Sequence, residues 1–279
     1  NGGGSLLEAN ALAQLFLGAG PKVQVKTSSG SIHGLGERRG FQFYDGPLAI
    51  LVNRFSASAS EILAGAIQDY ERGLVLGTDT FGKGTVQRVQ SLSLGQIKFT
   101  ESKFYRVSGK STQNKGISPD IYLPSPINTE EIGENKLPGA LEYDSIAKTK
   151  VRDFNRIIAS TDLLTSEHAE RINKSVLFKH LEKMKTWRKI QQDEKYLDLN
   201  IDNRRASKEN AEAELLAMEN DFRQKIGLNT FESYQAFLDR EEAEEEPDIE
   251  EEILLEAANV LSDFIKHSYK PVISMSKRG

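Results

Sequence analysis

The chain has 279 residues, no cysteine and a formal net charge of −5 at pH 7. This length accommodates two ordinary domains, and the missing cysteines exclude disulfides, thiol catalysis and zinc–thiolate sites. The charge argues against nucleic acid as the main partner, and the sequence contains no run of 18 apolar residues that could cross a membrane.

Residues 1–125 contain most of the glycines and the short β-branched runs, so they are predicted to form an α/β domain. Apolar residues at helical spacing predict a helix near 5–18, and alternation in "KVQVKTS" predicts a strand. The apolar run "PLAILVN" (47–53) is typical of a strand buried on both faces. A helix from Ser58 closing at Gly73 and a second buried strand, "LVLGT", follow it.

Two further alternating runs, "TVQRVQSLS" and "QIKFTESKFYRVSG", predict a hairpin that turns at Gly95-Gln96. The proline-rich segment after it predicts a connector, which divides the chain into domains 1–125 and 145–279 with the connector at 126–144.

The second half has helical periodicity, with helices predicted near 165–194, 205–226 and 249–267 and a strand-like "YLDLNID" at 196–202. The acidic run 240–252 is interpreted as a solvated hinge and an acidic helix start, and a site for a basic partner or a divalent ion is the alternative. No metal site is predicted from the four histidines, because they are far apart without metal-ligand spacing (His33, His168, His180 and His267).

Three serines alternate with alanines in "RFSASASEI" (54–62). Ser58 and Glu61 match a capping box, and taken alone the box would explain both residues. The serines follow a predicted buried strand, however, and the carboxyl ends of strands are where α/β proteins place their sites. The helix N-terminus also offers free N–H groups to a developing oxyanion. This position favours a nucleophile.

Lys83 is the candidate general base, since no histidine is well placed. A helix of about 14 residues runs roughly 20 Å away from Ser58, and the next strand returns by roughly the same distance. The loop "TFGKGTVQ" therefore comes back to the level of Ser58. A lysine amine acts as a base when burial favours its neutral form. A surface lysine on a glycine-rich hairpin is the plain alternative.

A phosphate-binding loop is a second competitor, because "GTDTFGKG" (77–84) nearly matches its pattern. Gly84 occupies the position of the magnesium-binding hydroxyl, and a strand pattern follows where a helix is required. No nucleotide is therefore expected.

Three motifs, "NGGGS", "VNRFSASASEI" and "GKGTVQ", together resemble the C-terminal processing, or tail-specific, serine protease family. The segment "FYRVSGKSTQNKGISPDIYLP" and the helical tail resemble its bacterial tail-specific branch. The resemblance covers essentially the whole chain. It implies an α/β (α+β) protease core with a mixed sheet and flanking helices, followed by a mostly α-helical C-terminal domain.

The resemblance implies a Ser–Lys endopeptidase that uses no cofactor and no metal. Ser58 would be the nucleophile and Lys83 the general base, and Gln87 would hold the lysine amine in line.

The implied oxyanion hole consists of the backbone N–H groups of Ala59 and Gly4, with Gly3 shaping the turn. Glu61 and Asp69 would support the site, and a plain helix-surface acid is the open alternative for Asp69.

The implied substrates are proteins with apolar, unstructured C-termini in the bacterial periplasm. An adaptor lipoprotein, or a second copy of the chain, would bind the helical domain, and in a competing interpretation this domain is a binding module beside a silent dyad. A Ser–Lys amidase or esterase on small substrates is a further alternative. The family usually carries a PDZ domain and the first core strands before "NGGG", so we expect this exact chain to hydrolyse proteins poorly.

Overall fold

The computed structural model describes residues 1–151, 154, 161–194, 196–240 and 247–267. It divides into two compact units. The first unit contains Asn1–Leu123, Ile127–Thr165 and the chain from Ala257 onward, and the second contains Pro124–Pro126 and Ser166–Glu256. None of the described helices combines the length and the hydropathy that crossing a membrane requires.

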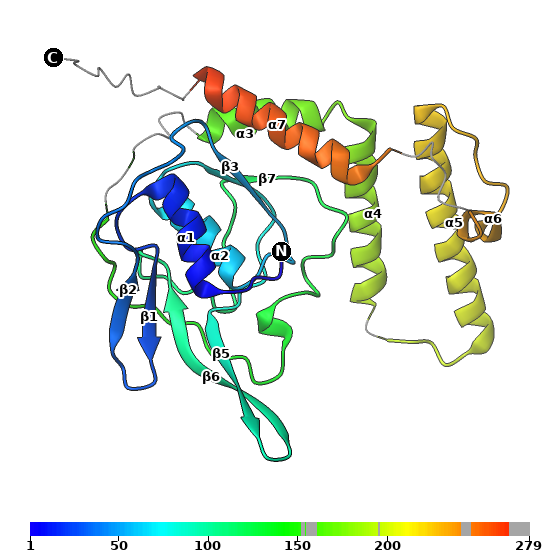
Figure 1. Ribbon diagram of the computed structural model, residues 1–279. Coiled ribbons are helices and arrows are strands. Elements are labelled where there is room, and N and C mark those ends of the chain that lie inside the picture. The colour runs from blue at the N-terminus through cyan, green and yellow to red at the C-terminus, as the bar shows by residue number, and fades with distance from the viewer. Residues whose placement is uncertain (152–153, 155–160, 195, 241–246, 268–279) are drawn as a thin grey trace. The chain divides into compact units, whose positions relative to one another are not determined.

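Residues 1–136 of the first unit form two sheets, the helices α1 and α2 and a 3₁₀ turn (Figure 1). The elements are α1 (Leu6–Leu17), β1 (Val23–Thr27), β2 (Ile32–Leu35), β3 (Ala49–Val52), α2 (Ala59–Asp69), β4 (Leu74–Gly77), β5 (Thr85–Leu92), β6 (Gly95–Tyr105), β7 (Ile121–Tyr122) and a 3₁₀ turn at Glu134–Lys136. One sheet is antiparallel with the order β2-β1-β6-β5, and the other is parallel with the order β3-β4-β7. The predicted fold class is confirmed, with its antiparallel and parallel strands in separate sheets.

Helix α1 forms because its small and apolar residues recur every four positions. Ala9, Ala13 and Leu17 are all buried and form one stripe. The helix begins at Ser5, whose side chain accepts a hydrogen bond from the Glu8 N–H at 3.3 Å. This stripe packs on α2 and β6, so the residues that precede α1 lie close to the start of α2.

Strand β4 is buried along its whole length, as predicted, but the prediction that the 47–53 strand is buried on both faces is wrong. Strand β3 is an edge strand of its sheet, and Leu51 on it is 46% exposed. Its continuous apolar run is consistent with its parallel pairing with β4. The hydrophobic pattern of the sequence does not tell an edge strand of this kind from a central one.

Two predicted boundaries also move. Helix α2 ends at Asp69 rather than at Gly73, because Glu71 adopts a positive φ of 50° and turns the chain toward β4. The hairpin turns at Ser93-Leu94 rather than at Gly95-Gln96, since Leu92 pairs with Gly95. Gly95 has a φ of 119° there, so the glycine serves the end of the strand and not the turn itself.

The helical region consists of α3 (Thr161–Ile172), α4 (Val176–Asp193), α5 (Ile201–Ile226), α6 (Tyr234–Leu238) and α7 (Ile249–His267). The long helix predicted at 165–194 is broken between α3 and α4. Ser175 caps α4 by accepting a hydrogen bond from the Phe178 N–H at 3.2 Å. A local cap of this kind interrupts a helix without disturbing its hydrophobic period.

The strand predicted at 196–202 is absent from the described chain. Residues 196–200 form a loop, and Asn200 caps α5 by accepting hydrogen bonds from the N–H groups of Asp202 and Asn203. In the second unit, α4 packs on α5 through a cluster of buried apolar residues, Leu177, Phe178, Leu181 and Phe222.

The predicted connector 126–144 makes specific contacts with the rest of the first unit. The Glu134 N–H donates to Phe81 O at 3.0 Å, and Lys103 Nζ pairs with Asp144 at 2.5 Å. The domain boundaries drawn from the sequence stay a prediction. Residues 241–246 of the acidic run 240–252 lie outside the described residues.

Candidate active site

Ser58 occupies a strained turn at the start of α2. Its φ is 58° and its ψ is −111°, a conformation that residues other than glycine rarely adopt. Such strain persists only where surrounding contacts hold it, and it concentrates at functional sites. A sharp, strained turn into a helix is also how α/β-hydrolases expose a serine hydroxyl. Glu61 holds the turn by accepting the Ser58 N–H at 2.7 Å, which is half of the predicted capping box.

The glycine run at the N-terminus lies against this turn. A Cβ on Gly3, whose φ is 96°, would lie 2.5 Å from Ala57 O and 3.0 Å from Ala59 N, so only glycine fits. The Ala57 N–H also donates to Asn1 O at 3.2 Å, and Asn1 Oδ1 accepts the Gly3 N–H at 3.0 Å. The structure therefore places Gly3 beside Ser58.

The loop that carries Lys83 is hydrogen-bonded at every backbone N–H and C=O from Thr80 to Gly84. The N–H groups, in chain order, donate to Ile117 O, Ser56 O, Glu61 Oε1, Glu61 Oε2 and Gln113 Oε1. The C=O groups, in the same order, accept from the Arg54 guanidinium, Glu134 N, Asn114 N, Thr112 Oγ1 and Phe104 N. Satisfied backbone groups are typical of regular secondary structure. This glycine-rich loop is therefore firmly held, unlike the surface hairpin considered as an alternative.

Glu61 connects the two halves of the site. Its fully buried carboxylate accepts hydrogen bonds from Ser58 N at 2.7 Å, Thr80 Oγ1 at 2.5 Å, Gly82 N at 2.7 Å and Lys83 N at 2.9 Å. Burial raises the pKa of Glu61 to about 7, and the four donated hydrogen bonds act in the opposite direction. The residue pattern predicts a cap for its own helix and the resemblance implies a supporting role, and the structure shows a carboxylate that accepts hydrogen bonds from both the serine turn and the lysine loop.

One pocket of about 410 Å³ brings five of the predicted residues together. Its lining includes Ser58, Ala59, Gly4, Lys83 and Gln87, together with Gly2, Ser5, Leu6, Ile62, Thr85, Val86, Lys98 and Phe104. Lys83 Nζ donates to Gln87 Oε1 at 3.1 Å, which is the contact predicted for Gln87. Lys83 is half-buried and Gln87 is exposed, so this chain alone does not close the water-poor pocket that we expect around the amine.

Asp69 lies at the far end of α2, eleven residues after Ser58 and therefore roughly 16 Å along the helix. Its carboxylate forms a two-pronged pair with the Arg106 guanidinium and accepts the Ser108 N–H at 3.1 Å. Its side chain is only 8% exposed, so the plain surface acid considered as an alternative is not what the structure shows. Asp69 anchors α2 to the chain that follows β6.

Asp69→Asn is expected to lower the free energy of unfolding by about 3 kcal/mol, because it leaves the mostly buried Arg106 charge without its partner. Urea unfolding followed by circular dichroism measures this loss. Glu101→Gln is the matched control, since the pair of Glu101 with Arg88 is exposed on both sides and contributes roughly 0.5 kcal/mol or less. Equal losses in the two variants would contradict an anchoring role for Asp69.

Two family models match the chain. Residues 1–123 match peptidase family S41, and residues 127–266 match the C-terminal domain of tail specific protease. The chain is a member of the tail-specific proteases of family S41. The pocket with Ser58 and Lys83 is therefore interpreted as the candidate active site of a serine peptidase of this family.

Two relatives in sequence agree with this membership. The tail-specific protease of Haemophilus influenzae is 38% identical over 277 residues, which cover 95% of this chain and 39% of that protein. The carboxy-terminal-processing protease of Bartonella bacilliformis is 35% identical over 150 residues, covering 51% of this chain and 35% of the relative. Among solved structures, the photosystem II D1 C-terminal processing protease is 37% identical with a TM-score of 0.39, covering 44% of this chain and 32% of that one. The chain thus spans well under half the length of these relatives.

Proposed function

We propose that Ser58 and Lys83 form the catalytic dyad of a serine endopeptidase that cuts proteins near apolar, unstructured C-termini. The observation that carries this proposal is the buried Glu61 carboxylate, which binds the backbone of both residues at the wall of one pocket. A carboxylate that only caps its own helix needs the hydrogen bond from Ser58 N but not the one from Lys83 N. The second bond fixes the lysine loop relative to the serine turn, and two reacting groups need such a fixed geometry.

The reaction follows from the roles of these groups. The neutral Lys83 amine takes the proton of Ser58 Oγ as the oxygen attacks the scissile carbonyl carbon. The Ala59 and Gly4 N–H groups stabilise the oxyanion of the tetrahedral intermediate. The protonated amine then gives its proton to the leaving amine, and water hydrolyses the acyl-enzyme. A neutral amine requires that water be excluded from Lys83, and a bound substrate would supply this cover.

An acyl adduct tests this reaction directly. The full-length protein is mixed with an unfolded peptide substrate, quenched in acid within one turnover, digested and examined by mass spectrometry. The proposal requires the added mass on the peptide that contains Ser58. An adduct on another residue would contradict the proposal. So would cleavage of the substrate without any adduct, measured where deacylation is slow enough for an acyl-enzyme to accumulate.

A peptide substrate is favoured over a small ester by the free edge of β5. Among the described residues β5 pairs only with β6, and its first residues, Thr85 to Gln87, line the pocket. An extended chain that pairs with this edge would gain backbone hydrogen bonds beside the scissile bond.

We therefore expect kcat/KM for an unfolded, tail-labelled peptide to exceed that for a small ester of the same acyl residue by roughly 100-fold, since binding energy from remote residues raises the rate. Both substrates are measured with the full-length protein at one pH. An ester that reacts as fast as the peptide would favour the amidase or esterase alternative.

A binding role for the helical region has its own support. Tyr196, Leu197 and Leu199 in the loop between α4 and α5 are 86%, 74% and 95% exposed. Exposed apolar residues in sequence often mark a protein interface. A periplasmic adaptor lipoprotein, or a second copy of the chain, is the partner proposed for this loop. Leu199→Asp should weaken that binding without changing the acyl adduct on Ser58, which separates the two roles.

A further inference from the structure

The backbone around Lys83 rests on a second segment, Ser111 to Ile117, which runs along the lysine loop. Thr112 Oγ1 donates to Lys83 O at 3.1 Å, and the Asn114 N–H donates to Gly82 O at 2.8 Å. The next amide along the loop, the Gly84 N–H, donates to the side-chain oxygen of Gln113 at 2.9 Å. Gln113 is completely buried. The neutral amide side chain of Gln113 is thus hydrogen-bonded to the residue that directly follows the candidate base.

Gly84 and Gln113 pack too closely for any other residue at position 84. A Cβ on Gly84 would lie 2.8 Å from Gln113 N and 2.9 Å from Ser111 Oγ. The glycine therefore lets the loop approach the segment, and the hydrogen bond to Gln113 Oε1 satisfies the amide that this approach buries. Removal of that oxygen would leave the Gly84 N–H buried without a partner.

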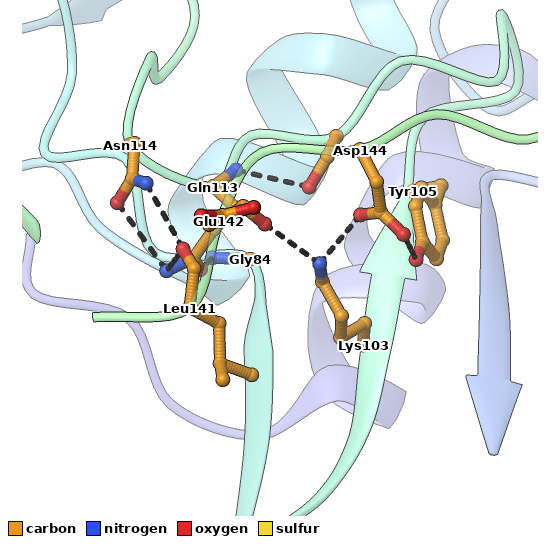
Figure 2. A network of polar contacts seen from close by, with 9 residues as sticks. Gly84, Lys103, Tyr105, Gln113, Asn114, Leu141, Glu142 and Asp144 are labelled. Carbon is orange, nitrogen blue, oxygen red and sulfur yellow. Dashed lines mark hydrogen bonds and ion pairs between the residues drawn. The ribbon is translucent and has the colours of Figure 1, made fainter. Parts of the chain in front are cut away.

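The other end of the Gln113 side chain is also held. Figure 2 shows Gln113 between Gly84 and Leu141, and Gln113 Nε2 donates to Leu141 O at 3.0 Å. Asn114 Nδ2 donates to the same carbonyl at 2.9 Å. The orientation of the Gln113 amide follows from these partners, because its oxygen faces a donor and its nitrogen faces an acceptor.

Leu141 in turn belongs to a segment with fixed anchors. Lys103 Nζ donates to Glu142 O at 3.0 Å and pairs with Asp144, and Tyr105 OH donates to Asp144 Oδ2 at 2.9 Å (Figure 2). This segment falls in the predicted connector. It acts as a brace that extends from the end of β6, through Leu141 O and Gln113, to the lysine loop.

We propose that Gln113 is a positioning residue for Lys83, which holds the lysine loop in place by bonding Gly84 on one side and Leu141 on the other. The inference rests on the proposed function of Lys83 as the base. Only a side chain with one acceptor and one donor matches both partners, and glutamine supplies them without charge. A shift of the loop by about 1 Å is expected to lower the rate on the order of 100-fold, because proton transfer depends on the distance between Ser58 and the amine.

The first test replaces Gln113 by Leu, which keeps the size of the side chain and removes both hydrogen bonds. In the full-length protein, assayed well below its Tm, kcat for an unfolded peptide should fall by about 10- to 100-fold. KM should stay within about threefold, because Gln113 is not among the residues that line the pocket.

Asn114→Gly is the matched control. Asn114 donates to the same Leu141 carbonyl and accepts a long hydrogen bond of 3.4 Å from Gln113 Nε2, but its side chain makes no contact with Gly84 among those the structure describes. Its φ of 65° suits glycine, so the backbone is preserved. Its kcat should remain within about twofold of the wild-type value.

Gln113→Glu adds a readout that loss of stability would not produce. A protonated glutamic acid still offers one acceptor and one donor, whereas the ionised form has no donor for Leu141 O and places a charge beside it. The ratio of its kcat to the wild-type kcat should therefore decrease as pH rises through the ionisation of the new carboxyl. Taking the ratio removes the pH dependence of the dyad itself.

Three results would overturn the positioning role: a kcat of Gln113→Leu within twofold of wild type, an equal loss in Asn114→Gly, or a ratio for Gln113→Glu that does not change with pH. If Gln113→Leu does not fold, the pH dependence of the Glu variant decides. Lys83→Ala, assayed in parallel, separates this inference from the proposed function. An active Lys83→Ala would refute the dyad, whereas an inactive Lys83→Ala beside a fully active Gln113→Leu would refute only the role of Gln113.

Discussion

Ser58→Ala is expected to lower the cleavage of an unfolded, tail-labelled substrate by the full-length protein by a factor of about 10⁴ or more, the usual consequence of removing a nucleophile that acts with its base as one unit. The change deletes a single oxygen. The strained turn should survive, because Glu61 bonds the backbone N–H of Ser58 and not its side chain.

Ser60→Ala is the matched control, since Ser60 lies two residues further along and does not line the pocket with Lys83. Its rate should stay within about threefold of wild type. Cleavage is followed by the release of the labelled tail, and far-ultraviolet circular dichroism checks the fold. Residual activity of Ser58→Ala above a tenth of wild type would show that Ser58 is not the nucleophile.

Lys83→Met should be nearly as damaging, with a fall in kcat of about 10³- to 10⁴-fold, because it keeps a long unbranched side chain and removes the amine that accepts the proton. The loop should remain in place. Its holding contacts are made by the backbone groups from Thr80 to Gly84 and by the Thr80 hydroxyl, and none of them uses the lysine side chain.

Lys83→Arg distinguishes a base from a simple positive charge. Its guanidinium stays protonated at any accessible pH and cannot accept a proton, so this variant should be as inactive as Lys83→Met. Lys110→Met, at an exposed lysine on the turn after β6, is the control and should leave kcat unchanged. Full activity in Lys83→Arg would mean that position 83 supplies charge and that the base lies elsewhere.

Local patterns in the sequence were sufficient for several of these conclusions. The lengths of the helix and the buried strand between Ser58 and Lys83 predict that the two residues end at the same edge of the core. They lie on one pocket in the structure. Element length and periodicity are local properties, and they determine where each loop begins and ends.

Contacts between distant segments were outside the reach of such patterns. Asp69 finds Arg106 across 37 positions, and Gly84 finds Gln113 across 29. Glu61 was predicted to cap its own helix and to support the site, but its hydrogen bonds to the lysine loop were not predicted. The break at Ser175 and the turn at Ser93 escaped prediction for a related reason, because a cap or a pairing register depends on small energy differences between neighbouring residues.

The sequence alone therefore predicts the helix and strands that flank Ser58 and Lys83 and, through its motifs, the peptidase family. Only the tertiary structure shows what holds the serine and lysine loops. Glu61 accepts hydrogen bonds from both loops, and the brace runs from Leu141 through Gln113 to Gly84. The physical reason is that a buried polar group must find its partner wherever packing places one, and packing joins segments that the chain keeps far apart.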